Sequence, residues 1–136
     1  MKRTALLNRH VSALVARLGH LDEIVIADAG LPVPDTVPVI DLAVIPGLPG
    51  FFDILTALRS ELVIEAAVYA SEASPDLAKR IEAELDIWSK ECDQAITVGT
   101  ASHNALKDRS HKAKAVIRTG EVTPYANLVL VSGVAF

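Results

Sequence analysis

The strongest constraint on the fold of this chain is the alternation of strand-length aliphatic runs with segments of helical periodicity. The extended runs span residues 23–27, 39–43, 62–69, 95–98, 115–117 and 128–131. Apolar residues at helical spacing occupy 7–18, 51–58 and 77–88, and a short helix is expected after Ser102. Strands separated by helices predict a mostly parallel sheet with helices on both faces. We therefore expect a single α/β domain over residues 1–136.

Local signals mark where several of these elements begin and end. Asn8 can cap the first helix and Gly19 can end it. Ser74 followed by Pro75 predicts the start of the long helix, because proline is favoured at the first helical position. The segment 30–38 carries three prolines and is expected to be a loop.

Composition and charge limit which binding partners and which cellular compartment are expected for this chain. Hydrophobic residues make up 51 % of the 136 residues and aromatics only 4 %, so the expected core is aliphatic. A net charge of -4 gives no electrostatic reason to expect nucleic acid or an anionic membrane as a partner. The single cysteine, Cys92, excludes an internal disulfide and fits a reducing cytoplasm. No export signal is visible, because Asn8, Arg9 and His10 interrupt any apolar region.

Familiar catalytic motifs do not occur in this chain. Its glycines form neither a dinucleotide-binding fingerprint nor a phosphate-binding loop, and no nucleophile elbow or HExxH pair is present. The four histidines lack clustered partners of the kind that a metal site shows. We therefore expect a site without metal or cofactor that works by simple proton transfer.

His20 is the candidate for that proton transfer. It follows the predicted helix end at Gly19 and precedes the strand that ends at Asp28. An imidazole with an ordinary pKa of about 6.5 can both give and take a proton near neutral pH. The alternative is that His20 merely interacts with the C-terminal end of the first helix. Position alone favours that alternative.

Asp28 ends an otherwise apolar strand, where a carboxylate is costly unless it is hydrogen-bonded or functional. Three roles are open from the local sequence. Asp28 can orient His20, it can accept hydrogen bonds from a polyol, or it can cap the turn over residues 29–32.

Two further polar groups are candidates for sugar binding. His103 and Lys107 lie four residues apart, so they share a helical face that is either a donor-rich wall or a solvated surface. The segment Tyr125, Ala126 and Asn127 offers a phenol, an amide and backbone groups just before the last strand, although it also reads as a plain turn. Other polar residues are interpreted as structural: Glu65 and Glu72 as exposed strand residues rather than buried acids of the site, and Glu121 as a cap or a partner of Arg118.

Four segments resemble the D-ribose pyranase family, in order and nearly from end to end. They are LNRHVSALVARLGHLDEIVIADAGLPVP, IDLAVIPGLPGF, SHNALK and AVIRTGEVTPYANLVLVSGVAF. The related L-fucose mutarotases are similar around Gly19-His20 and Gly120-Glu121, but they depart from DAGLPVP and TPYAN. The ribose branch therefore fits better.

The resemblance implies a cytoplasmic isomerase of sugar metabolism that interconverts the pyranose and furanose rings of β-D-ribose. It implies that His20 is the proton donor and that Asp28, His103 and the segment 125–127 bind the sugar, with Lys107 close by. It also implies a ring-shaped homodecamer with sites at subunit boundaries. Two alternatives remain: a non-catalytic sugar-binding accessory protein of ribose uptake, and a mutarotase of another sugar such as L-fucose.

Overall fold

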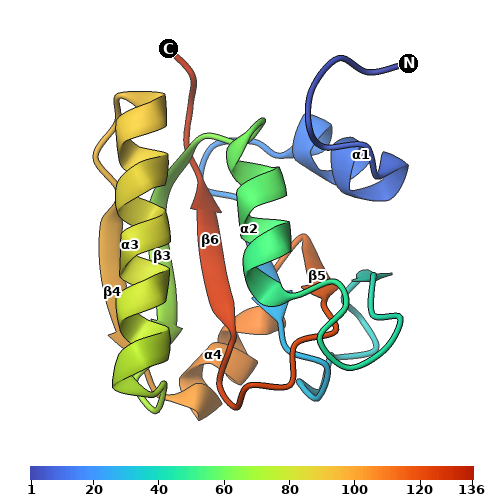
Figure 1. Ribbon diagram of the computed structural model, residues 1–136, viewed down its shortest axis with the longest axis vertical. Coiled ribbons are helices and arrows are strands. Elements are labelled where there is room, and N and C mark those ends of the chain that lie inside the picture. The colour runs from blue at the N-terminus through green and yellow to red at the C-terminus, as the bar shows by residue number, and fades with distance from the viewer.

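The computed structural model describes the whole chain, residues 1–136, as one sheet with four helices (Figure 1). The elements are α1 (Arg9–Arg17), β1 (Glu23–Ala27), β2 (Val39–Asp41), α2 (Phe51–Arg59), β3 (Ile64–Ala70), α3 (Pro75–Cys92), β4 (Thr97–Ala101), α4 (His103–Ser110), β5 (Ala115–Arg118) and β6 (Leu128–Ser132). This arrangement confirms the predicted α/β domain. None of the helices combines the length and apolar character needed to cross a lipid bilayer.

The sheet has six strands in the order β2-β5-β1-β6-β3-β4. Neighbouring strands are parallel in three pairs, β2–β5, β5–β1 and β3–β4. The sixth strand, β6, lies between β1 and β3 and is antiparallel to both. The start of β6 therefore meets the carboxyl ends of β1 and β3 at one edge of the sheet, and its end meets their starts at the opposite edge.

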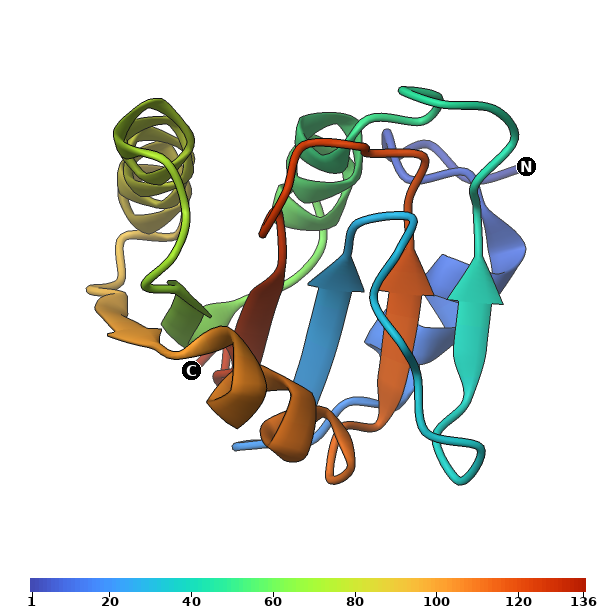
Figure 2. The same cartoon turned by 90° about the horizontal axis from the view of Figure 1, so that it is seen from below.

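Helices cover both faces of the sheet, as predicted. The larger core packs α1, α2 and α3 against one face, and it includes Trp88, whose Nε1–H donates to the Leu62 carbonyl at 2.8 Å. The smaller core lies on the other face, where α4 contributes Leu106. Figure 2 shows α4 opposite α2 and α3, and the segment after β1 crossing beside it. That segment completes the second face with Leu31 and Val37.

The predicted helix starts are confirmed by side-chain caps. The Asn8 carboxamide accepts from the backbone N–H groups of His10 and Val11. Ser74 accepts from Leu77 N–H, and Ser102 accepts from Ala105 N–H. Each cap satisfies an N–H group that the first turn of a helix leaves unpaired.

The fourth strand begins at Thr97 rather than at Ala95, so its predicted start is wrong by two residues. The preceding residues are used to leave α3. Asp93 adopts a left-handed conformation with φ 50°, and the Gln94 carbonyl accepts from the Ser89 hydroxyl at 2.7 Å. The hydrophobic pattern does not reveal this turn, because the hydrogen bonds that hold it are made to residues of α3.

Candidate functional site

A polar cluster forms at the sheet edge where β1 ends and β6 begins. The Asn127 Nδ2–H donates to Asp28 Oδ2 at 2.9 Å, and the Asp28 backbone N–H donates to Asn127 Oδ1 at 3.0 Å. Asn127 is 1 % exposed, so its amide is held almost out of contact with water. Asp28 Oδ1 also accepts from Gly30 N–H at 2.9 Å. Asp28 therefore caps its turn, as one interpretation expected, and is at the same time fixed by Asn127.

His103 and Tyr125 stand next to this pair. Their rings meet edge to face with centroids 5.3 Å apart and an interplanar angle of 79°. Tyr125 has a left-handed φ of 65°, and its carbonyl accepts from Asn127 N–H at 2.7 Å. His103 Nδ1 is buried and has no hydrogen-bond partner within the chain. A buried polar atom without a partner costs about 1–3 kcal/mol, so this nitrogen is suited to a ligand hydroxyl.

Glu72 holds the start of α4 in place. Both of its carboxylate oxygens accept from the His103 backbone N–H, at 2.9 and 3.0 Å. That hydrogen bond lowers the pKa of Glu72 below its ordinary value. Glu72 is exposed, as expected, but it lies in the turn after β3 rather than in the strand, and it has the added role of binding the start of α4. The sequence carries no signal for this contact, because it joins residues 31 positions apart.

Lys107 and Ala126 contribute to this edge in different ways. Lys107 lies one turn along α4 from His103, is half-buried, and its ammonium group makes no ion pair within the chain. Ala126 is fully buried and belongs to the larger core. Within one chain neither its side chain nor its backbone is exposed, and its N–H donates to the Thr123 carbonyl.

His20 lies at the opposite edge of the sheet. It belongs to a turn in which Gly19 N–H donates to Asp22 Oδ2 at 2.8 Å and Leu21 has φ 66°. Leu21 N–H donates to the carbonyl of Ser132, the last residue of β6. Asn127, by contrast, directly precedes the first residue of β6, so the two contacts lie at opposite ends of that strand. The length of β1 separates His20 from Asp28, and a five-residue strand rises about 17 Å. One chain therefore does not bring His20 to the polar cluster.

The partner of His20 is Glu65. The Nε2 atom of His20 lies 2.8 Å from Glu65 Oε2, and 52 % of the His20 side chain is exposed. Within one chain Asp28 therefore does not orient His20, and the interpretation of Glu65 as a simple exposed strand residue is wrong. Sequence inspection missed the contact because the two residues are 45 positions apart.

Glu121 stabilises the turn between β5 and the polar cluster. Although burial acts against its charged form, hydrogen bonds from Thr123, Phe51 and Val122 lower the pKa of Glu121. The predicted capping role agrees with these bonds. The alternative pairing with Arg118 is wrong, because Arg118 Nη1 instead lies 2.8 Å from Asp41 Oδ2.

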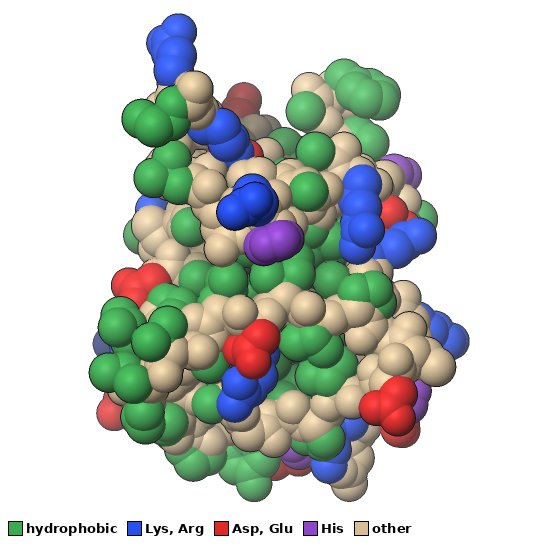
Figure 3. All heavy atoms as spheres, turned by 90° about the vertical axis from the view of Figure 1, so that its right-hand side faces the viewer, with side chains coloured by type: hydrophobic (Ala, Val, Ile, Leu, Met, Phe, Trp, Pro, Cys, Tyr) green, Lys and Arg blue, Asp and Glu red, His purple; other side chains and the backbone are tan.

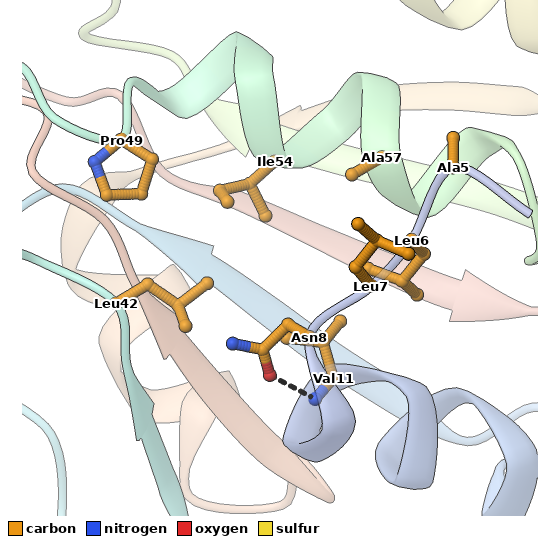
Figure 4. A pocket seen from close by; sticks show the side chains of 9 residues that line it. All are labelled: Ala5, Leu6, Leu7, Asn8, Val11, Leu42, Pro49, Ile54 and Ala57. Atoms are coloured by element: carbon orange, nitrogen blue, oxygen red, sulfur yellow. Dashed lines mark hydrogen bonds between the residues drawn. The ribbon is translucent and has the colours of Figure 1, made fainter. Parts of the chain in front are cut away.

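A separate groove is apolar and lies away from the polar cluster. It has a volume of about 320 Å³ and is lined by Ala5, Leu6, Leu7, Asn8, Val11, Leu42, Pro49, Ile54 and Ala57 (Figure 4). The only polar side chain in it, Asn8, already caps α1. Figure 3 shows the same side of the molecule, where hydrophobic side chains form a band between α1 and the segment after β2. A surface of this kind does not suit a sugar.

Fold and site together define a small α/β protein whose polar sheet edge suits a small ligand rich in hydroxyl groups. The chain belongs to the RbsD / FucU transport protein family, whose family model matches residues 1–135. This finding confirms the resemblance seen in the sequence.

Known relatives match the chain over its whole length. It is 48 % identical to the D-ribose pyranase of Aeromonas hydrophila and 49 % identical to that of Photobacterium profundum, with 100 % of each chain covered. It is 45 % identical to Bacillus subtilis RbsD complexed with D-ribose, with a TM-score of 0.87 and 100 % of both chains covered. The fucose mutarotase from Streptococcus pneumoniae, complexed with L-fucose, is 23 % identical with a TM-score of 0.73, covers 98 % of this chain and 99 % of its own, and shows the fold alone.

Proposed function

We propose that this protein is a D-ribose pyranase, an intramolecular isomerase that interconverts the pyranose and furanose forms of β-D-ribose. The observation that carries this proposal is full-length identity of 48–49 % to proteins of that name. The ribose-bound RbsD structure supports the ribose branch over the fucose branch, since its identity to this chain is 45 % against 23 % for the fucose mutarotase.

The polar cluster has the groups that ribose binding needs. Sugar hydroxyls both donate and accept, so a site requires acceptors and donors in fixed positions. Asp28 supplies a carboxylate that Asn127 orients. His103 Nδ1 has no hydrogen-bond partner within the chain, and Tyr125 is 38 % exposed, so both can serve the sugar. Lys107 adds a cationic donor, and Ala126, buried in the larger core, holds Tyr125 and Asn127 in place on either side of it.

His20 is assigned as the proton donor of the reaction. Ring opening breaks the bond between the anomeric carbon and the ring oxygen. The ring oxygen takes a proton from the imidazolium, and the anomeric hydroxyl loses its proton to water or a second base, leaving an open-chain aldehyde. Rotation and closure through a different hydroxyl reverse these transfers. General acid–base help of this kind is worth ~10²–10⁴ in rate.

A complete site requires two copies of the chain. Within one copy the length of β1, about 17 Å, separates His20 from Asp28. We therefore place the site at a subunit boundary, where His20 of one copy meets the polar cluster of another. The exposed aliphatic residues support association, since Leu7, Val44 and Ile45 are 67 %, 73 % and 60 % exposed. The assembly that the family resemblance implies is a cytoplasmic homodecamer.

Exchange NMR on ribose tests the proposal. The protein should produce exchange between the pyranose and furanose signals, and His20→Ala should abolish that exchange while the amide spectrum of the fold persists. L-Fucose, measured in parallel, should respond less than ribose. Ribose binding without faster exchange would instead identify a sugar-binding accessory protein, and full activity in His20→Ala would remove His20 from the mechanism.

A further inference from the structure

Glu65 occupies an irregular position at the start of β3. In the pairing of β3 with β6, Ile64 lies opposite Ser132 and Ala66 lies opposite Val131, so Glu65 is an extra residue in the strand. A bulge of this kind turns a side chain out of the regular alternation and is frequent beside active sites. Here the bulge directs the Glu65 carboxylate to His20 Nε2, at 2.8 Å.

The turn that carries His20 is attached to the same point of the sheet. Leu21 N–H donates to the Ser132 carbonyl at 2.9 Å, and Ser132 N–H donates to the Asp22 carbonyl at 2.8 Å. The bulge and the turn are thus both anchored at the end of β6. Leu21 adopts φ 66°, a conformation that side-chain-bearing residues rarely take and that persists where the surroundings enforce it. The separation of His20 and Glu65 is therefore set by backbone hydrogen bonds.

No other acid competes for His20 on this turn. Asp22 is the carboxylate within the turn itself, and its Oδ2 accepts from Gly19 N–H at 2.8 Å. Its Oδ1 lies 3.3 Å from the Lys114 ammonium group. Both oxygens of Asp22 are thus engaged elsewhere, and Glu65 is the acidic partner of the imidazole.

We propose that Glu65 is a positioning residue that holds the proton of neutral His20 on Nε2, so that Nδ1 is the nitrogen that exchanges a proton with the sugar. An ionised carboxylate can only accept, so the hydrogen bond requires a proton on Nε2. A neutral imidazole has one N–H, so Nδ1 is then the free acceptor, and in the imidazolium it is the free donor. This inference rests on the proposed function, because it assigns a task to the catalytic His20.

The effect of Glu65 on catalysis can be separated from its effect on folding. His20 and Glu65 are 52 % and 30 % exposed, and ion pairs exposed to water contribute little to stability. Variants of Glu65 are therefore expected to remain folded. If Glu65 were merely structural, substituting it would leave the tautomer of His20 unchanged. If Glu65 positions the proton of His20, substituting it changes the tautomer.

The experiment combines ¹⁵N NMR of the His20 ring with exchange NMR on ribose. In the wild type, the neutral ring should carry its proton on Nε2. Glu65→Ala should give a mixture of tautomers and slow the pyranose–furanose exchange about tenfold at saturating ribose, with ribose affinity unchanged. That loss is smaller than the ~10²–10⁴ that complete acid–base help is worth, because His20 itself is retained. Glu65→Gln keeps the size but offers both a donor and an acceptor, so it should also mix the tautomers.

Glu91→Gln is the matched control, since it neutralises an acid that is 53 % exposed on α3 and paired with Arg59. It should have the same His20 tautomer, exchange rate and ribose affinity as the wild type. An unchanged Nε2–H tautomer or an unchanged exchange rate in both Glu65 variants would overturn the inference, and so would a loss of ribose affinity without a change of tautomer. If Glu65→Ala lost its native amide spectrum, Glu65→Gln would decide. Failure of the proposed function is recognised separately, by a wild type without exchange activity or by a fully active His20→Ala.

Discussion

Asp28 and Asn127 exchange two hydrogen bonds across the junction of β1 and β6, although they lie 99 positions apart in the chain. In one bond the Asn127 Nδ2–H donates to the Asp28 carboxylate, and in the other the Asp28 backbone N–H donates to the side-chain oxygen Oδ1 of Asn127. This reciprocal contact fixes the carboxylate at the edge of the sheet. It depends on β6 running antiparallel to β1, which brings the start of one strand to the end of the other.

Asn127→Ala is expected to weaken both folding and ribose binding. The substitution leaves the Asp28 N–H and carboxylate without their partner, and an unsatisfied buried group costs about 1–3 kcal/mol. Urea denaturation measures the loss of unfolding free energy, and isothermal titration calorimetry measures the loss of ribose affinity. Asn104→Ala, on the exposed side of α4, is the control and should change neither quantity.

Tyr125→Phe is expected to reduce ribose affinity without harming the fold. It removes the hydroxyl but keeps the ring that packs edge to face on His103. The loss of one hydrogen bond of about 0.5–1.5 kcal/mol corresponds to a fall in affinity of roughly two- to twelvefold. Tyr69→Phe provides the contrast, because its hydroxyl donates to Glu82 and its loss should leave ribose affinity unchanged. Equal ribose affinity in Tyr125→Phe and the wild type would remove this hydroxyl from the site.

Gly120→Ala is expected to destabilise the domain. A Cβ atom at position 120 would lie 2.5 Å from the Leu48 carbonyl oxygen and 2.6 Å from that of Ile45. Both contacts are with backbone, so the segment 45–48 would have to move, and overpacking of this kind costs about 1–3 kcal/mol. Thermal or urea unfolding measures the effect. Gly99→Ala, where the nearest heavy atom is 4.0 Å away, should be tolerated.

The link between Glu72 and His103 should weaken in acid. The pKa of Glu72 is lowered in the folded state, chiefly by the His103 backbone N–H. Its contribution to stability is therefore complete above the ordinary value of 4.5 and is lost as the pH falls through the lower value of the folded protein. The amide resonance of His103 should follow this titration, and Glu72→Gln should abolish it. A His103 amide that titrates identically in Glu72→Gln would contradict the assignment.

Mixed assemblies test the shared site directly. Subunits carrying His20→Ala and subunits carrying Asp28→Ala should each be inactive when expressed alone. When the two are co-expressed, roughly one quarter of randomly assembled boundaries unite an intact His20 with an intact Asp28, so exchange activity should return to about that fraction. Continued inactivity in assemblies shown by native mass spectrometry to be mixed would argue against a site built from two copies.

Local sequence was sufficient for the elements and the class of fold. Aliphatic runs and helical periodicity predicted the strands and helices, and the caps at Asn8, Ser74 and Ser102 are where the structure has them. These features act over a few residues, so they can be recognised in the chain itself. The family resemblance likewise rests on continuous segments such as DAGLPVP and TPYAN.

Only the tertiary structure decided how the candidate site residues are grouped. The reversed direction of β6 joins Asn127 to Asp28, and the length of β1 keeps His20 away from both. A bulge in β3 turns Glu65 toward His20, 45 positions away. Such contacts follow from strand order, direction and register, which depend on the packing of the whole sheet and leave no mark in the residues next to each position.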